Sequence, residues 1–583
     1  MQQLANWLTH VQVHTVSMYF GTPKTNFNCN ITTIKRFQMF KATMKFSFLT
    51  TGLFLFAVAA SAQDTTGKKV RITSSFKPVL KEAAKINFNA SPAVNDTSRP
   101  RLQYNIPDQN LNLAFQPGGL RPLALAVDTG GRWKNESSLK AGVGNYATPF
   151  VQLGLSAGDG KNSGVNFYAQ HASSKGNIQY QDYSNTNAEL NGFFKAGNTE
   201  WNARVGGSLD KYKKYGFQPK TMTFPDDSIN VKYHTYRARL ALRNINRTDL
   251  GLSYAPEISI DAFSDGLSNS ESNSYINLPL QKTLGNSFEV DVAATANIST
   301  YKPHNKSSQT NNWFAISPSI LYKTANINIQ AGVRPAWDNK EPHLFPNLLA
   351  EVVSSDKRFS FQAGWTGYLR NAGFEYQAGI NPWIWAPQTV YNSSIEERYA
   401  GIKGSVGDHF SYSAKLAFNT IKNQPLFTND TINGGKSFRV INEPRMNVLN
   451  IGGEVGYTVG ETFSVISNFQ INQYSPKVAA KAWGLLPDEW KTTLRLQVLK
   501  DLYVNSELYA FDGTWYQKKG GGYGSLGSAF DLSAGLEFKV YKNIKIWGQF
   551  NNMLNQQYQR WNQYPVYGFN FLAGVVLSFG QIK

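Results

Sequence analysis

The chain has 583 residues, a formal net charge of +19 and one cysteine, and the single cysteine excludes an internal disulfide framework. Aromatic residues make up 14% of the chain and charged residues only 17%, whereas soluble domains average about 25% charged residues. After residue 62 no apolar run approaches the ~20 residues of a spanning helix, which excludes a helical membrane protein. The surplus of positive charge suits an anionic solute or lipid phosphates, and equally a set of lysines in solvated loops.

Residues 44–63 read MKFSFLTTGLFLFAVAASAQ, with one lysine, a short apolar run and Ala60-Ser61-Ala62 at its end. A secretory signal peptide has this order: a positively charged N-terminal region, an apolar segment, and small residues at the cleavage site. A buried core helix is the alternative, but such a helix would alternate with polar residues. We therefore predict a signal peptide over residues 44–62. Removing 62 residues and their five cations leaves 521 residues with a net charge of +14.

The two segments that flank this signal show no sustained periodicity. Residues 1–43 carry four cations, no acid and Cys29, and we interpret them as lying upstream of the true start, so that the mature chain has no cysteine. Residues 63–136 mix short apolar stretches with six prolines. We expect a periplasmic segment there, in part tucked into a lumen; the alternative is a flexible tail.

From about Ser137 onward the sequence has a period of two. In residues 530–540, one side of an extended chain carries only apolar residues: Leu532, Ala534, Leu536, Phe538 and Val540. The opposite side carries Asp531, Ser533, Gly535, Glu537 and Lys539. A strand places these two sets on an apolar face and a polar face, whereas a helix would distribute both sets around its whole surface.

The same alternation recurs along the chain in stretches that turn residues separate. It is found in residues 236–243, 288–292, 327–334, 494–498 and 571–579. We expect roughly 18–22 strands from residue 137 to residue 583, each near the ~9–11 residues that cross a bilayer. A soluble sandwich also alternates, but here Arg237, Arg239 and Arg243 form a row on the wet face. Since lipid cannot satisfy an open sheet edge, the last strand should pair with the first. The prediction is an all-β, transmembrane antiparallel β-barrel with a short N-terminal periplasmic segment.

The end of the chain resembles the last two strands of TonB-dependent outer-membrane receptors. The residues that carry this resemblance lie within 551–579 and are Asn552, Leu554, Asn555, Tyr558, Tyr564, Pro565, Gly568 and Phe571. A narrower resemblance, to receptor-like barrels without the usual plug, is carried by residues 70–97, 139–155, 171–178, 397–405, 450–457 and 481–490. The resemblance implies an outer-membrane barrel in a Gram-negative cell and leaves the ligand unspecified.

A receptor of this kind carries a plug of more than a hundred residues, but only 74 residues, 63–136, precede the first strand here. A barrel near 22 strands has a wide lumen. We therefore expect residues 63–136, inward-folded loops or a separate partner protein to block it. Residues 69–75 bear a weak likeness to the extended segment that pairs with TonB, and any strand-like stretch would look similar.

Catalytic and metal motifs are missing from the mature sequence. Its five histidines form no metal spacing, and it has no nucleophile elbow or Walker loop. His171 and Ser173 share one side of a strand, an arrangement that a lipid hydrolase could use. The favoured interpretation is a strand that becomes polar where it leaves the bilayer. We predict no enzyme, no cofactor and no nucleic-acid partner.

Three loops are rich in Pro, Gly, Asn and aromatic residues: 214–230, 381–394 and 421–436. Their rings suit stacking on a sugar or peptide, but an interfacial aromatic girdle is the favoured interpretation. Asp226 and Asp227 suit calcium, although a solvated loop is favoured.

The sequence thus predicts a receptor-like barrel in the cell outer membrane for uptake or passage of a polar solute along the inward row of charges and amides. Its partners are outer-membrane lipid and a plug or periplasmic protein. The alternative is a non-transporting scaffold that docks a partner for envelope assembly or secretion, and the third reading is a lipid-directed barrel enzyme. Ligand-binding residues are unknown at this level.

Overall fold

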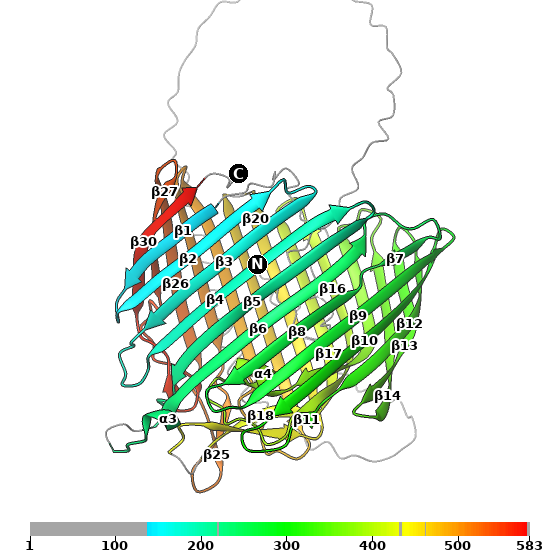
Figure 1. The fold of residues 1–583 in the computed structure, drawn as a ribbon. Helices are drawn as coiled ribbons and strands as arrows, with labels where there is room; N and C mark the ends of the chain where they lie inside the picture. Colours follow the sequence, from blue (N-terminus) through cyan, green and yellow to red (C-terminus); the bar gives the residue numbers. More distant parts are fainter. Residues whose placement is uncertain (1–136, 218–220, 431–433, 461, 580–583) are drawn as a thin grey trace, which may run out of the picture. The chain divides into compact units, whose positions relative to one another are not determined.

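The computed structural model describes residues 137–583 except 218–220, 431–433, 461 and 580–583. The expectations for residues 1–43, 44–62 and 63–136 therefore lie outside the described residues. The described residues form a closed antiparallel β-barrel of 22 spanning strands (Figure 1). This confirms the predicted fold at the upper end of the expected strand number.

The spanning strands of the first half are β1 (Ser137–Gly144), β2 (Thr148–Gly158), β3 (Ser163–Ser174), β4 (Tyr183–Ala196), β5 (Thr199–Lys213), β6 (Asn230–Asn244), β8 (Glu257–Asp265), β9 (Ser270–Leu284), β10 (Phe288–Lys302), β12 (Trp313–Lys323) and β13 (Ile327–Asp338). Those of the second half are β14 (Glu341–Val353), β15 (Phe359–Ala372), β16 (Tyr391–Val406), β17 (Phe410–Lys422), β20 (Met446–Val459), β21 (Phe463–Pro476), β22 (Asp488–Leu499), β23 (Leu502–Phe511), β26 (Ala529–Tyr541), β27 (Ile544–Asn551) and β30 (Asn570–Phe579).

Shorter elements decorate this barrel. The short strands β7 (Leu252–Tyr254) and β11 (Gln309–Thr310) join the main sheet. Three hairpins stand apart from it: β18 (Gln424–Asn429) with β19 (Phe438–Glu443), β24 (Trp515–Gln517) with β25 (Tyr523–Ser525), and β28 (Gln559–Trp561) with β29 (Tyr564–Pro565). The helices are α3 (Asp226–Ile229) and α4 (Phe374–Ile380). Among the described residues, no helix has the length and apolarity needed to cross a membrane.

The barrel closes where its first and last strands meet. Strand β1 pairs on one side with β2 and on the other with β30, with Ala141 opposite Val575. The predicted pairing of the last strand with the first is confirmed. Closure gives the backbone groups of both strands a partner, which hydrocarbon could not supply.

The two faces of the strands alternate as the sequence predicts. In β26, Leu536, Phe538 and Val540 are 39–57% exposed on the outer surface. In β13, Ile327, Ile329 and Val333 are exposed in the same way. An apolar surface of this extent is stable against lipid and not against water, so the outer wall is a membrane belt.

The two ends of the barrel differ in the length of their connections. At one end the turns are short, as at 159–162, 197–198, 285–287 and 542–543. In the first of these, Asp159 Oδ1 accepts three backbone N–H groups at 2.8–2.9 Å, and these bonds lower the pKa of its carboxyl to about 2. The other end carries long connections over 214–229, 373–390, 423–445, 512–528 and 552–569. Outer-membrane barrels have short periplasmic turns and long extracellular loops, so we assign the long-loop end as the outer end.

Candidate functional site beneath the loop cover

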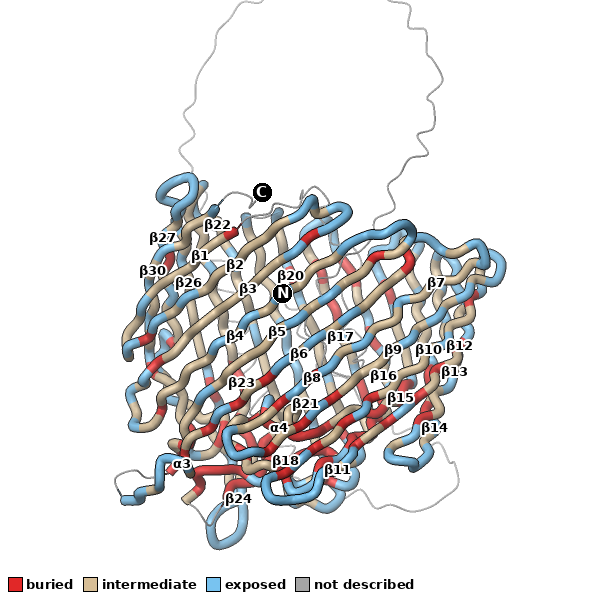
Figure 2. Tube along the Cα trace, viewed as in Figure 1, coloured by how far each residue is buried: buried red, intermediate tan, exposed pale blue. Residues whose placement is uncertain are grey.

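Three long loops pack against one another at the outer end of the barrel. We call residues 373–390, 423–445 and 552–569 the loop cover. Figure 2 shows buried residues gathered at this end, around α4 and β18. One buried apolar cluster joins these loops to the strands β6, β8 and β10: Val231, Tyr233, Phe263, Tyr301, Phe374, Ala378, Ile384, Val390, Phe427, Phe438, Trp561 and Tyr564. Because the members come from widely separated strands of the ring, the cluster spans the barrel mouth.

Aromatic contacts give the loop cover its packing. The ring of Trp561 lies 5.3 Å from Phe427 and 5.4 Å from Phe438, both near edge-to-face. The ring of Tyr564 lies 4.1 Å from that of Trp383. Pairs of this geometry contribute ~0.5–1.5 kcal/mol each beyond the area that they bury. The loop cover is thus a small core of its own.

Hydrogen bonds tie the loop cover together and to the barrel. The amide of Trp385 donates to Phe438 O at 2.8 Å, and the amide of Phe438 donates to Trp383 O at 3.0 Å. The Tyr564 hydroxyl donates to Lys436 O at 2.5 Å, and burial raises the pKa of this hydroxyl well above its usual value. From the barrel wall, the Tyr233 hydroxyl donates to Pro382 O at 2.8 Å. These bonds satisfy backbone groups that would otherwise be buried under the aromatic rings without a hydrogen-bond partner.

The predicted row of arginines lies on the inner wall, and each member has an acidic partner. Arg239 holds Glu257 with two hydrogen bonds of 2.8 Å, and Arg243 holds Glu200 at 2.9 Å and 3.0 Å. Arg237 Nε lies 3.5 Å from Asp261 Oδ1, and Arg237 Nη2 lies 2.6 Å from Glu375 Oε1, in the first turn of α4. These acidic partners neutralise the three arginines, and the contact between Arg237 and Glu375 anchors the loop cover to β6.

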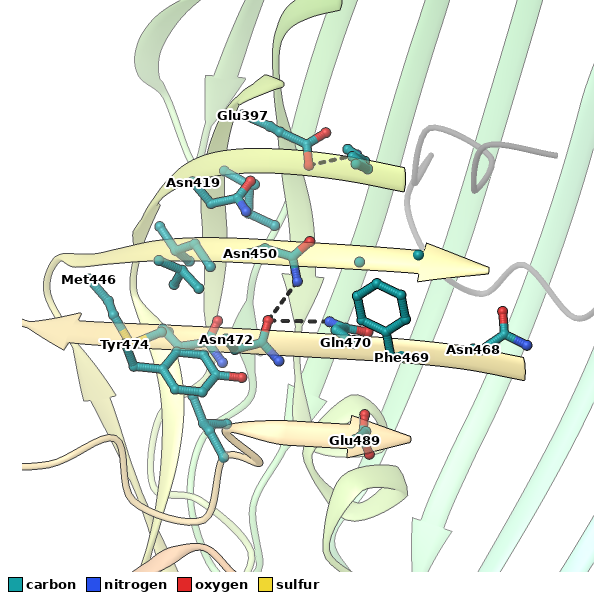
Figure 3. A pocket seen from close by; sticks show the side chains of 18 of the residues that line it. Glu397, Asn419, Met446, Asn450, Asn468, Phe469, Gln470, Asn472, Tyr474 and Glu489 are labelled. Atoms are coloured by element: carbon teal, nitrogen blue, oxygen red, sulfur yellow. Dashed lines mark hydrogen bonds and ion pairs between the residues drawn. The ribbon is translucent and has the colours of Figure 1, made fainter. Parts of the chain in front are cut away.

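A cavity of about 880 Å³ lies on the inner wall formed by β15–β17 and β20–β23 (Figure 3). Three amides form its centre: Asn450 Nδ2 donates to Asn472 Oδ1 at 2.7 Å, and Gln470 Nε2 donates to the same oxygen at 3.3 Å. Rings of Tyr368, Phe469, Tyr474 and Tyr509 lie among the lining residues. Figure 3 shows side chains from neighbouring strands, among them Asn419 of β17, Asn450 of β20 and Asn472 of β21, directed into one space.

The charged residues that line this cavity balance in number, with Arg370, Lys415 and Lys491 against Glu397, Glu454 and Glu489. Lys415 Nζ contacts Glu397 Oε1 at 2.9 Å and lies 4.3 Å from the centre of the Tyr399 ring. Glu489 accepts the Tyr509 hydroxyl at 2.7 Å. A lining of amides, rings and neutralised ion pairs fits an uncharged polar solute, because amides exchange hydrogen bonds with hydroxyl or peptide groups and rings cover apolar faces.

Loop 477–487 contributes one residue to the lining of the cavity. Leu485 lines the cavity, and the Tyr474 hydroxyl donates to Leu486 O at 3.0 Å. Glu443, at the end of β19, is 2% exposed and accepts the amides of Lys477, Val478 and Ala479 at 2.8–2.9 Å. The same β18–β19 hairpin that packs in the loop cover thus also holds loop 477–487 in place through Glu443.

The other sequence candidates have the following positions. His171 Nδ1 lies 2.8 Å from Thr186 Oγ1 on the neighbouring strand, so its described partner is Thr186 and not Ser173. Asp226 and Asp227 form the first turn of α3, and within the described part of the chain no group of three His, Cys, Asp or Glu could hold a metal ion. Of the aromatic residues in loops 381–394 and 421–436, Trp383 and Phe427 pack in or against the buried cluster of the loop cover, whereas Tyr391 is 44% exposed at the start of β16.

The cavity residues were not singled out from the sequence. Asn450 and Asn472 lie on the wet faces of two alternating segments, which marks them as inward-facing. Their meeting depends on the register of β20 against β21, in which these two residues are directly opposed. Alternation within one strand carries no information on that register.

The closed 22-strand wall, its apolar belt and its polar lumen define a large outer-membrane β-barrel. No family model matches the chain, and no curated protein matches it. Several solved structures share the fold. The siderophore receptor PirA from Acinetobacter baumannii matches with a TM-score of 0.59 at 11% identity, over 76% of this chain and 80% of that one. The FrpB iron transporter from Neisseria meningitidis matches with a TM-score of 0.58 at 11% identity, over 76% and 81%. The ferripyoverdine receptor of the outer membrane of Pseudomonas aeruginosa matches with a TM-score of 0.55 at 11% identity, over 76% and 72%.

At these identities the likeness establishes the fold of the barrel. The receptor-type barrel predicted from residues 551–579 is thereby confirmed as an architecture. The expected lack of a plug concerns residues before 137, which lie outside the described residues.

Proposed function

We propose that this protein is a receptor-like barrel that takes up a polar solute across the outer membrane and binds it in the cavity centred on Asn450 and Asn472. The observation that carries the proposal is the pairing of that amide-lined cavity with a packed loop cover at the outer end. The solved proteins of the same fold, named as receptors and an iron transporter, support the same direction.

The lining chemistry suggests an uncharged or internally neutral solute, such as a sugar or a short peptide. Amide side chains offer both hydrogen-bond donors and acceptors. The ion pairs Lys415–Glu397 and Lys491–Glu507 leave little net charge to attract a strongly anionic molecule. The volume of about 880 Å³ lies in the range of small-ligand sites, ~300–1,000 Å³. Entry from outside requires the loop cover or loop 477–487 to move.

Closure on the periplasmic side is a separate part of this proposal. We assign it to residues 63–136 or to a partner protein, since the loop cover lies at the outer end only. Planar-bilayer recording of the mature chain tests closure as a whole. A large, constant conductance would show an open pore and contradict both the gated passage and the block.

The uptake role is tested by comparing a deletion strain with complemented strains for depletion of sugars and peptides from the medium. Complementation with Asn450→Leu/Asn472→Leu should leave the deletion profile unchanged, because the double variant removes the central amides. Ile451→Ala is the matched control, since Ile451 lies next to Asn450 but is exposed on the lipid face. Equal depletion by deletion and complemented strains, together with a stably co-purifying envelope protein, would overturn uptake in favour of the scaffold role.

A further inference from the structure

A second pocket, of about 530 Å³, lies at the outer mouth and is separate from the lumenal cavity. It is bounded by the start of β6, the β8–β9 turn, the connection after β10 and residues 384–388. Its floor is buried, with Lys214, Tyr233 and Ile384 only 3–6% exposed. Its rim residues Leu267 and Lys306 are exposed, so the pocket opens outward from the protein.

Lys214 places an unpaired ammonium in the floor of this pocket. The side chain is 3% exposed, and its Nζ lies 4.1 Å from the centre of the Trp385 ring. Among the described residues, no carboxylate lies within ion-pair distance of it and no side chain accepts a hydrogen bond from it. Since a buried charge is costly unless something pairs with it, this lysine has an unfilled requirement for an anion.

The two nearest carboxylates are committed elsewhere. Asp265 Oδ1 accepts the amides of Leu267 and Asn269, both at 2.9 Å, and its Oδ2 accepts Asn269 Nδ2 at 2.7 Å. Asp430 Oδ2 accepts Trp385 Nε1 at 3.1 Å, and its Oδ1 lies 3.6 Å from Arg439. Each carboxylate therefore already has hydrogen-bond partners other than Lys214.

Further cations surround the pocket. Lys232 and Lys306 line it together with Lys214, whereas Asp265 is the one carboxylate among the described lining residues. Lys306 Nζ donates to Gln388 at the rim. Lys436 lies behind the floor, where its Nζ donates to Ser228 Oγ at 3.1 Å. The pocket thus combines a positive lining with a buried cation at its base.

We propose that this outer-mouth pocket binds a phosphate group, with Lys214 as the buried contact and Lys306 as the rim contact. Three ammonium groups around one opening suit the compact charge of phosphate, which lysine binds as a point charge. The group could belong to a free sugar phosphate or to the phosphorylated core of lipopolysaccharide beside the barrel. This proposal is independent of solute passage through the lumen.

Calorimetry on the purified mature protein in detergent tests it, with inorganic phosphate and glucose 6-phosphate as probes. Lys214→Met should weaken binding by about tenfold or more, as expected for loss of a hydrogen bond to a charged group. The matched control is Lys481→Met, because Lys481 also stacks on a ring, that of Trp515 at 4.3 Å, but in another loop. Far-UV circular dichroism confirms that both variants keep the barrel. No binding by the wild type, or equal loss in both variants, would overturn the site.

The pH dependence supplies an independent readout. Burial, with the nearby Lys436, lowers the pKa of Lys214 to about 8, while Asp265 and Asp430 oppose this shift. Relative to Lys214→Arg, which stays charged and reports the ionisation of phosphate itself, the wild type should therefore lose phosphate affinity between pH 7 and pH 9 as Lys214 loses its proton. An identical fall in wild type and Lys214→Arg would contradict the role of Lys214.

The source of the phosphate is separated by a second comparison. Binding to lipopolysaccharide micelles that inorganic phosphate displaces, and that Lys214→Met abolishes, would assign the site to the lipid. Binding of glucose 6-phosphate with no Lys214-dependent binding to lipopolysaccharide would assign it to a free solute. Binding of neither probe would refute the proposal.

Discussion

Replacing Trp561 with alanine should open the loop cover while leaving the barrel intact. Trp561 is 5% exposed and packs edge-to-face on Phe427 and Phe438, which belong to the β18–β19 hairpin. Buried Trp→Ala substitutions cost ~3–5 kcal/mol. The barrel strands keep their own ladders of hydrogen bonds, so the cost falls on the loop cover. With 1.4 kcal/mol per factor of ten, the opened population should rise roughly 100- to 4,000-fold.

Hydrogen exchange followed by mass spectrometry measures this opening directly, because local exchange follows the population of the open form. The amides of Trp385 and Phe438, bonded within the loop cover, should exchange faster by that factor, while those of β20 and β21 should not change. Trp365→Ala is the matched control, since Trp365 is 41% exposed on the outer wall. Exchange at Phe438 that rises less than tenfold, or rises equally in Trp365→Ala, would refute the view that these rings hold the loop cover shut.

Two further predictions concern the barrel wall and its periplasmic turns. Val575→Arg, in the middle of the lipid face of β30, should destabilise the folded barrel in vesicles by ~2–4 kcal/mol, measured by urea titration. Val576→Glu should be tolerated, because Val576 lies opposite Lys140 and Lys545 on the inner wall. Equal losses of stability in the two variants would contradict the assigned faces. The carboxyl of Asp159 should titrate near pH 2 by NMR: its folded pKa is depressed, so its contribution to the turn is present above its ordinary value of 3.8 and is lost as the pH falls through about 2. A titration midpoint near 3.8 would show that the three backbone hydrogen bonds are absent in solution.

The barrel itself was predictable because the information is local. In β6, Tyr236 and Leu240 are oily while Arg237 and Arg239 are wet, and any extended chain turns such residues to opposite sides. Lipid outside and water inside then select a closed cylinder, since a sheet edge has no partner in hydrocarbon. The same reasoning paired β30 with β1.

The functional surfaces were not predictable in this way. Loop aromatics such as Trp383 and Phe427, which pack in the loop cover, were assigned to a girdle because aromatic residues among polar ones are typical of both a girdle and a loop core. The acidic partners of the arginine row, among them Glu200 and Glu257, carry no sequence mark of that role. Each lies on a neighbouring strand at a register that the sequence does not state.

The sequence by itself thus determined a two-faced chain that must close in a membrane, because side-chain direction in a strand depends only on position along it. Tertiary structure decided what fills the outer mouth and which side chains line the lumenal cavity. The Tyr564 hydroxyl meets Lys436 across 128 residues, and Asn450 meets Asn472 only through the strand register. The first contact arises from the closure of the whole ring, which places distant loops over one opening, and the second from the pairing of two adjacent strands; no local pattern encodes either.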